Sequence, residues 1–83
     1  MRVEWKRKAL KQLREIPFDY RCKIGKAVEG LMKWPDCGMD IKKLSGRSDY
    51  RLRVGRYRVI FDIFDSLEII SIEEVKKRDE HTY

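Results

Sequence analysis

The spacing of apolar residues changes once along this chain of 83 residues, from the period of a helix to that of a strand. Between Trp5 and Ile16 apolar residues recur every three or four positions, which predicts an amphipathic helix. Pro17 ends this helix, because the residue before a proline avoids the helical conformation. From Tyr50 onward apolar and polar residues alternate, which predicts strands. The first half should therefore supply helices that cover a sheet formed by the second half.

Capping and turn-forming residues set the other boundaries. A second helix is predicted from Phe18 to Trp34, with Asp19 as its N-cap. Its core stripe begins at Cys22 or Lys23 and continues through Ile24, Ala27, Val28, Leu31 and Met32. A short edge strand is expected at 2–5, a connector at 36–46, and a meander of strands near 50–54, 57–63 and 67–75. The predicted fold class is α+β, with two N-terminal helices packed on an antiparallel β-sheet (β-α-α-β-β-β) in a single domain over residues 1–83.

Composition excludes several classes of protein. Hydrophobic residues make up 42% of the chain, enough for a folded core despite 41% charged residues. No apolar run is long enough to span a bilayer or to form the core of a signal peptide, so we expect a cytoplasmic protein without a membrane partner. Two cysteines, Cys22 and Cys37, are expected to be reduced thiols, and with His81 as the single histidine we expect no metal site and no cofactor.

Positive charge is concentrated in residues 41–60. This window has seven basic residues and one acid, so its net charge of +6 equals that of the whole chain. The basic residues are Lys42, Lys43, Arg47, Arg51, Arg53, Arg56 and Arg58. Arg51 and Arg53 are two positions apart, as are Arg56 and Arg58, so each pair points to one face of a strand. Guanidinium groups match phosphate oxygens, which makes nucleic acid the first partner to consider; an acidic protein partner or a solvated strand face are the alternatives.

The polar tail adds groups of a different kind. His81 has the one side chain whose ordinary pKa lies near neutrality, so it is a candidate for proton transfer. Tyr83 offers a phenol, and its ring can stack on a base. The alternative for both residues is a solvent-exposed or docked chain end.

The central motif resembles that of the RelE/ParE toxin superfamily. The family signature is Leu-x-Gly followed by Tyr-Arg-x-Arg-x-Gly-x-Tyr-Arg and two hydrophobic residues. In this chain it is formed by Leu44, Gly46, Tyr50, Arg51, Arg53, Gly55, Tyr57, Arg58, Val59 and Ile60. Two helices before the motif, and a strand and basic tail after it, extend the resemblance over essentially the whole chain and imply a RelE-like fold.

The resemblance implies a RelE-like mRNA interferase, a ribosome-dependent endoribonuclease that cleaves mRNA in the ribosomal A site without metal, by attack of a 2′-hydroxyl. The catalytic residues it implies are Arg51, Arg53, Arg58, Lys77, Arg78, His81 and Tyr83. Lys42, Lys43, Arg47 and Arg56 are the expected RNA contacts. The alternative within the superfamily is a ParE-like inhibitor of DNA gyrase. Arg51 and Arg53 stand where the RelE type has lysines, and either Lys77 or Arg78 can be the basic residue of the tail.

The same resemblance implies the partners. A toxin of this kind acts on the ribosome and its mRNA, and a cognate antitoxin protein wraps it and covers or displaces the active tail. The toxin–antitoxin complex can bind operator DNA through the antitoxin. The basic residues of the first helix, Lys6, Arg7, Lys8, Lys11 and Arg14, would suit rRNA phosphates, or they form a solvated helix face.

Overall fold

The computed structural model describes residues 1–77. In chain order the elements are β1 (Arg2–Trp5), α1 (Arg7–Arg14), α2 (Phe18–Gly30), β2 (Ile41–Lys43), β3 (Tyr50–Val54), β4 (Tyr57–Phe64) and β5 (Ile69–Lys77). A short 3-10 turn, Leu31–Lys33, extends α2, and another, Asp65–Leu67, joins β4 to β5. No helix within residues 1–77 combines the length and apolarity needed to cross a membrane.

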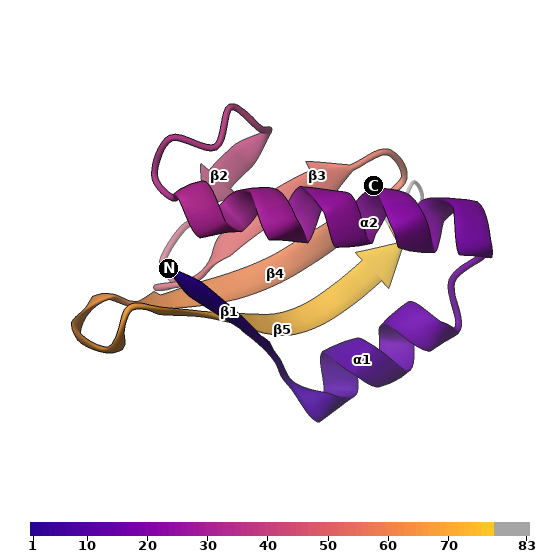
Figure 1. Cartoon of the computed structure of the whole chain (residues 1–83), viewed down its shortest axis with the longest axis horizontal. Helices are drawn as coiled ribbons and strands as arrows, with labels where there is room; N and C mark the ends of the chain where they lie inside the picture. Colours follow the sequence, from indigo (N-terminus) through magenta and orange to yellow (C-terminus); the bar gives the residue numbers. More distant parts are fainter. Residues whose placement is uncertain (78–83) are drawn as a thin grey trace.

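The strands form one five-stranded sheet in the order β1-β5-β4-β3-β2 (Figure 1). The pairs from β2 to β5 are antiparallel, as the predicted meander requires. β1 pairs with β5 in parallel, and the two helices and three strands between them supply the long connection that a parallel pair needs. The predicted two-helix α+β architecture is confirmed, with a mixed sheet in place of an antiparallel one.

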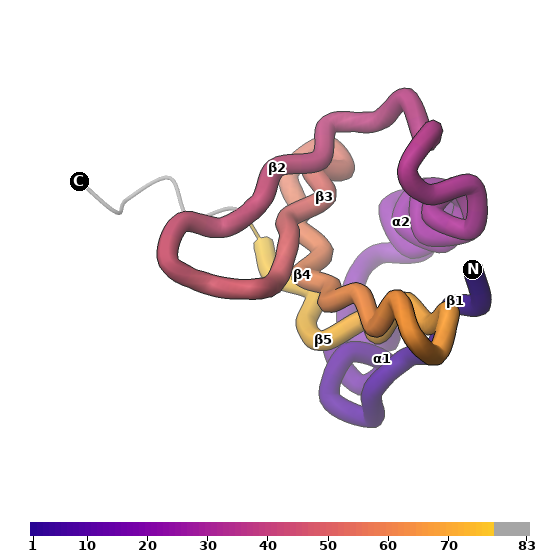
Figure 2. Tube along the Cα trace, turned by 90° about the vertical axis from the view of Figure 1, so that its left-hand side faces the viewer, coloured from indigo at the N-terminus to yellow at the C-terminus, as the bar shows by residue number. Residues whose placement is uncertain are grey.

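The two helices have different positions on the sheet. α2 lies across one face, on one side of the strands β2 to β5 in Figure 2. α1 lies beside β5, next to the part of its outer edge that β1 does not cover. The Gln12 side-chain oxygen accepts a hydrogen bond from the Val75 backbone N–H at 2.7 Å. α1 thereby satisfies part of the outer edge of β5 as a neighbouring strand would.

Four local predictions were wrong. The edge strand predicted at 2–5 is confirmed as β1, but the first helix begins at Arg7 and not at Trp5. The N-cap of α2 is Pro17, which leaves Asp19 in the first turn, where a carboxylate still stabilises the helix N-terminus. Cys22 and Met32, expected in the core, are exposed.

The fourth correction is β2, which forms inside the predicted connector because β3 offers it an antiparallel partner: Ile41 lies opposite Leu52. A three-residue strand has too few positions to show alternation, so its sequence carries no strand signal.

The core lies between the covered face of the sheet and the helices. Its largest fully buried side chains come from α2, the segment after it and the three long strands: Phe61, Ile24, Leu31, Leu52, Ile70, Ile72 and Val59. α1 contributes the fully buried Ala9. Trp34 packs edge-on against Tyr50 and Phe61, and these two rings stack at a centroid distance of 5.5 Å. This packing holds β3 and β4 against the segment that follows α2, and the residues between the core positions project from the opposite face.

Gly55 makes the tight turn between β3 and β4. Its φ of 57° is a conformation that other residues adopt at a cost. A Cβ at this position would also lie 3.1 Å from Cε1 of Tyr20 in α2. Glycine is therefore favoured here by its backbone conformation and by the close approach of Tyr20, and the turn fixes the register of the strands that carry the arginines.

Candidate nucleic-acid interface

The face of the sheet opposite α2 carries arginines of β3 and β4. Leu52 and Val59 are buried in the core, so Arg51, Arg53 and Arg58 project from the opposite side of their strands. We call this side the open face. It brings together the three strand arginines that the family resemblance implies as catalytic. The predicted strand pair of Arg56 and Arg58 was wrong, because Arg56 lies in the turn before β4.

Strand register places three cations side by side on the open face. Arg53 lies directly opposite Arg58, and Arg58 lies directly opposite Lys76. We call Arg53, Arg58 and Lys76 the cation row. Like charges that face each other across strands destabilise a sheet. A bound anion would offset this repulsion, so the row has the electrostatics of a phosphate-binding surface.

Sequence reasoning named Lys77 and missed Lys76. The β4–β5 ladder shifts register between Ile60 and Phe61, where Glu73 is the extra residue. After this bulge Val75 points into the core, Lys76 faces Arg58, and Lys77 faces Tyr57. An unbroken ladder would have placed Val75 opposite Arg58 and Lys77, rather than Lys76, on the open face, and nothing in the sequence marks the bulge.

Two arginine nitrogens on this face have no hydrogen-bond partner within residues 1–77. They are Nε of Arg58 and Nη1 of Arg51, and both are buried. Buried donors are almost always paired in native proteins, and leaving one unpaired is costly. Both guanidinium groups can therefore donate a further hydrogen bond to an oxygen atom of a ligand.

Arg51 is the most buried of these cations, with 9% of its surface exposed. Its Nη2 donates to the Asp40 carboxylate at 3.3 Å, and the same carboxylate lies 3.8 Å from Nε of Arg53. Asp40 lies just outside the predicted basic window, so sequence reasoning did not include it. The pair of arginines on β3 thus shares one acid.

The four residues expected to contact RNA lie in different positions relative to the open face. Lys42 lies opposite Arg51 in the β2–β3 pair, whereas Lys43 faces Tyr50. Arg47 lies in the loop between these strands and forms an ion pair of 2.6 Å with Asp49, which offsets much of its charge. Arg56 is exposed in the turn after Gly55.

Glu74 is the acid nearest in sequence to Lys76, and it connects the cation row to α1. Its carboxylate accepts from Nζ of Lys8 at 2.9 Å and lies 3.6 Å from Nζ of Lys76. The Lys8 hydrogen bond, followed by the charge of Lys76, lowers the pKa of Glu74 although partial burial opposes this effect. On the same strand, a hydrogen bond from Lys6 to Glu73 raises the pKa of Lys6.

Three predicted catalytic residues lie outside the described residues: Arg78, His81 and Tyr83. Lys77 is the last described residue and ends β5 beside Tyr57. The described part of the site therefore comprises arginines, lysines and the acids paired with them, and it contains no histidine.

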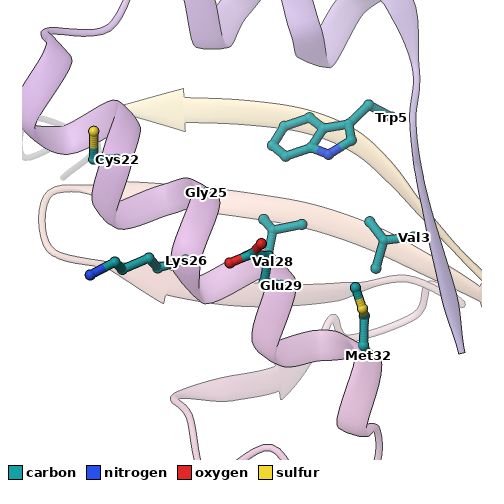
Figure 3. Close-up of a pocket in the computed structure, with 8 residues that line it drawn as sticks. All are labelled: Val3, Trp5, Cys22, Gly25, Lys26, Val28, Glu29 and Met32. Atoms are coloured by element: carbon teal, nitrogen blue, oxygen red, sulfur yellow. The ribbon is translucent and has the colours of Figure 1, made fainter.

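A second surface feature is a groove between β1 and α2 (Figure 3). Its volume is about 530 Å³, and it is lined by Val3, Trp5, Cys22, Gly25, Lys26, Val28, Glu29 and Met32. Val3, Trp5 and Met32 give it an apolar surface, while Lys26 and Glu29 lie along the helix rather than converging on a common point. The groove suits contact with an apolar surface better than it suits chemistry.

Comparison with known proteins identifies the family. Residues 3–82 match the family described as "ParE toxin of type II toxin-antitoxin system, parDE". The chain is 31% identical over 80 residues to a candidate toxin named RelE1 from Methanocaldococcus jannaschii, covering 93% of this chain and 89% of that protein.

Solved structures give the same result for the fold. The chain is similar to a chain of the archaeal RelE–RelB complex from Pyrococcus horikoshii, with a TM-score of 0.81, 27% identity and coverage of 95% and 96% of the two chains. The isolated Escherichia coli RelE toxin also has a TM-score of 0.81, at 19% identity, with coverage of 98% of this chain and 87% of that chain. The signature on β3 and β4, the fold and these matches agree: the chain belongs to the RelE/ParE toxin superfamily and is a toxin of a type II toxin–antitoxin system.

Proposed function

We propose that this toxin is a ribosome-dependent endoribonuclease that cleaves mRNA in the ribosomal A site. The observation that carries the proposal is the cation row, which lines up Arg53, Arg58 and Lys76 on a sheet face with unfilled guanidinium donors. RNA supplies the phosphate oxygens that these donors lack. Similarity to proteins named RelE supports the same reaction class.

The proposed reaction is internal attack by a ribose 2′-oxygen on the adjacent phosphorus. The 2′-hydroxyl gives up its proton, the new oxygen–phosphorus bond forms, and the bond from phosphorus to the 5′-oxygen breaks as that oxygen takes up a proton. Negative charge grows on the non-bridging oxygens in the transition state. Arg58, at the centre of the cation row, is the proposed clamp for this charge, with Arg51, Arg53 and Lys76 beside it.

Proton transfer requires residues other than these arginines, because arginine remains protonated in proteins. His81 and Tyr83 are the proposed candidates, and the roles of acid and base stay open between them. Lys77 and Arg78 remain candidates for additional phosphate contacts from the tail.

Dependence on the ribosome fits the composition of the site. A set of cations that binds phosphate but does little to orient the 2′-oxygen should be weak on free RNA. A ribosome that holds mRNA in a reactive geometry would supply this orientation.

α1 offers a surface for contact with rRNA. Lys6 and Lys8 are engaged by Glu73 and Glu74 at 2.9 Å, but Arg7, Lys11 and Arg14 form no ion pair within residues 1–77. Positions 7, 11 and 14 fall on one side of a helix. Together with Trp5 and Leu10 they line a hollow of about 550 Å³. Cations beside an aromatic ring suit RNA, which offers both phosphates and stacking faces.

The proposed protein partner is a cognate antitoxin. Similar solved structures are of RelE–RelB complexes, from Pyrococcus horikoshii and from Methanococcus jannaschii. An antitoxin would inhibit the toxin by covering the cation row or by displacing the tail, and operator DNA would be contacted through the antitoxin.

The second candidate is inhibition of DNA gyrase, favoured by the match to the ParE family and by Arg51 and Arg53 in place of lysines. Two assays on the same purified toxin separate the candidates: primer extension on mRNA bound to programmed ribosomes, and gyrase supercoiling. We expect cleavage on ribosomes, little cleavage of free mRNA and unchanged supercoiling. Blocked supercoiling without cleavage would replace the nuclease proposal with the gyrase proposal.

A further inference from the structure

Asp40 precedes β2 and faces both arginines of β3. One carboxylate oxygen lies 3.3 Å from Nη2 of Arg51, and the other lies 3.8 Å from Nε of Arg53. The backbone is fixed as well, because the Arg53 N–H donates to the Asp40 carbonyl at 3.0 Å. The carboxylate therefore bridges two cations from a defined position.

This bridge leaves part of both arginines available. The 3.8 Å separation is too long for a hydrogen bond to Arg53, and Nη1 of Arg51 has no partner within residues 1–77. Asp40 keeps 55% of its side chain exposed, whereas the Arg51 side chain is 10% exposed. The carboxylate can turn toward solvent without disturbing the core, while Arg51 is held in place.

We propose that Asp40 is a built-in anion that holds Arg51 and Arg53 in the absence of RNA and is displaced by an RNA phosphate. This inference rests on the proposed ribonuclease function and adds a regulatory contact to its phosphate site. A phosphate bound between these arginines would be within reach of Nη2 of Arg51, Nε of Arg53 and the unpaired Nη1 of Arg51. Phosphate is thus the more complete ligand, and Asp40 is a competitor for it.

The competition has a functional consequence. Free RNA must displace the Asp40 carboxylate before its phosphate can bind both Arg51 and Arg53, so the affinity of the toxin for free RNA is reduced. The same competition lowers the binding of ribosome-bound mRNA less, because the ribosome holds the phosphate next to the arginines at a high effective concentration. Asp40 would therefore act as a positioning residue that suppresses binding to RNA outside the ribosome.

The test uses the full chain and a short labelled oligouridylate with 2′-O-methyl sugars, which binds but offers no 2′-hydroxyl for attack. Asp40→Asn keeps the backbone and size but removes the charge. We expect about two- to fivefold tighter binding, the value of one exposed charge interaction. The slope of log affinity against log salt should become more negative by about 0.7, equivalent to one additional phosphate contact. Asp36→Asn, an exposed acid without an ion pair within residues 1–77, is the matched control and should show neither change.

A double-mutant cycle tests whether the gain in RNA affinity of Asp40→Asn acts through Arg53. The gain from Asp40→Asn should shrink in an Arg53→Gln background, because one of the two cations that Asp40 screens is then absent. Equal gains from Asp36→Asn and Asp40→Asn would reduce Asp40 to a general surface charge and overturn the inference. Weaker binding by Asp40→Asn would overturn it too, by making the carboxylate a requirement for the arginine geometry. If the ribosome cleavage assay fails but these binding results are obtained, the nuclease proposal is removed and the anion competition stands. If neither the parent toxin nor Asp40→Asn binds the oligouridylate, the competition itself is overturned.

Discussion

Arg58 lies between Arg53 on one neighbouring strand and Lys76 on the other. If it neutralises charge that grows in the transition state, Arg58→Ala should lower the cleavage rate by about 10²–10³-fold, the loss found for one electrostatic donor in an active site. Affinity for the ribosome should change much less, because the interaction strengthens only as the reaction proceeds. Single-turnover cleavage and ribosome pelleting measure the two quantities.

The matched variants are Arg58→Lys and Arg2→Ala. Lysine keeps the charge but not the fork of donors, so it should restore only part of the rate. Arg2 is an exposed arginine of β1, and its loss should leave the rate near that of the parent. Equal losses of rate and affinity in Arg58→Ala would instead make Arg58 a docking residue.

His81 and Tyr83 can be separated by their chemistry. Tyr83→Phe keeps the ring but removes the phenolic proton, and His81→Gln keeps polarity but removes titration. If His81 transfers the proton, we expect the pH–rate profile to lose its near-neutral inflection in His81→Gln alone. Cleavage at the parental rate by both variants would leave the chemistry to the arginines and the ribosome.

The sequence predicted the arginines of the site because strand alternation is local and the Tyr-Arg-x-Arg signature is specific. It could not predict Lys76, because the choice between Lys76 and Lys77 depends on a bulge at Glu73 that only strand pairing reveals. Asp40 was missed for a similar reason: its pairing with Arg51 depends on β2, which has no pattern of its own.

Among the elements, α1 shows most clearly how one charged helix can serve two purposes. Lys6 and Lys8 connect its N-terminal end to β5, whereas Arg7, Lys11 and Arg14 form no ion pair within residues 1–77 and are the proposed rRNA contacts. Replacing these three residues together by Gln should weaken ribosome binding by about tenfold or more and flatten its salt dependence, since each lost phosphate contact reduces the slope by about 0.7.

The matched control for α1 replaces three other exposed lysines by Gln: Lys23, Lys26 and Lys33. The change in net charge is identical, so this variant should bind ribosomes nearly as the parent does. Equal weakening in both variants would assign the effect to total charge. Loss of antitoxin binding with intact ribosome binding would assign the α1 surface to the protein partner instead.

For the whole molecule, Glu74 makes stability depend on pH. Its pKa in the folded protein lies below the ordinary value of 4.5, so its contribution is present above that value and is lost as the pH falls through the lowered pKa. Glu74→Gln should therefore reduce the free energy of unfolding by about 0.5–1 kcal/mol at neutral pH, as expected for ion pairs whose lysine partners are solvent-exposed, and by much less near pH 3.

Urea unfolding of parent and variant at the two pH values measures this difference. Glu15→Gln removes an exposed acid that has no ion pair within residues 1–77, and it should show no such pH-dependent gap. A gap for Glu74→Gln that persists unchanged in acid would mean that packing, rather than the Lys8 and Lys76 pairs, carries the contribution.

The overall architecture was predictable because a helical spacing of apolar residues extends over much of the first half of the chain and a strand spacing over the second half. The parallel pairing of β1 with β5 was not, since it joins segments separated by most of the chain and a four-residue strand does not encode its partner. Helix boundaries moved by a few residues where Trp5 was needed in the sheet and where Pro17 provided the N-terminus of α2.

The position of α1 also bears on aggregation. β5 is nine residues long, and without a neighbour its outer edge would be an open template for another chain. β1 covers the first part and the Gln12 side chain occupies the Val75 donor further along, so the outermost strands of the sheet are β1 and β2, with four and three residues. Both carry charged side chains, Arg2 and Glu4 on one and Lys42 and Lys43 on the other. Charges on short edge strands discourage edge-to-edge pairing, so we expect the lysines of β2, whatever their part in binding RNA, to help keep copies of the free toxin apart.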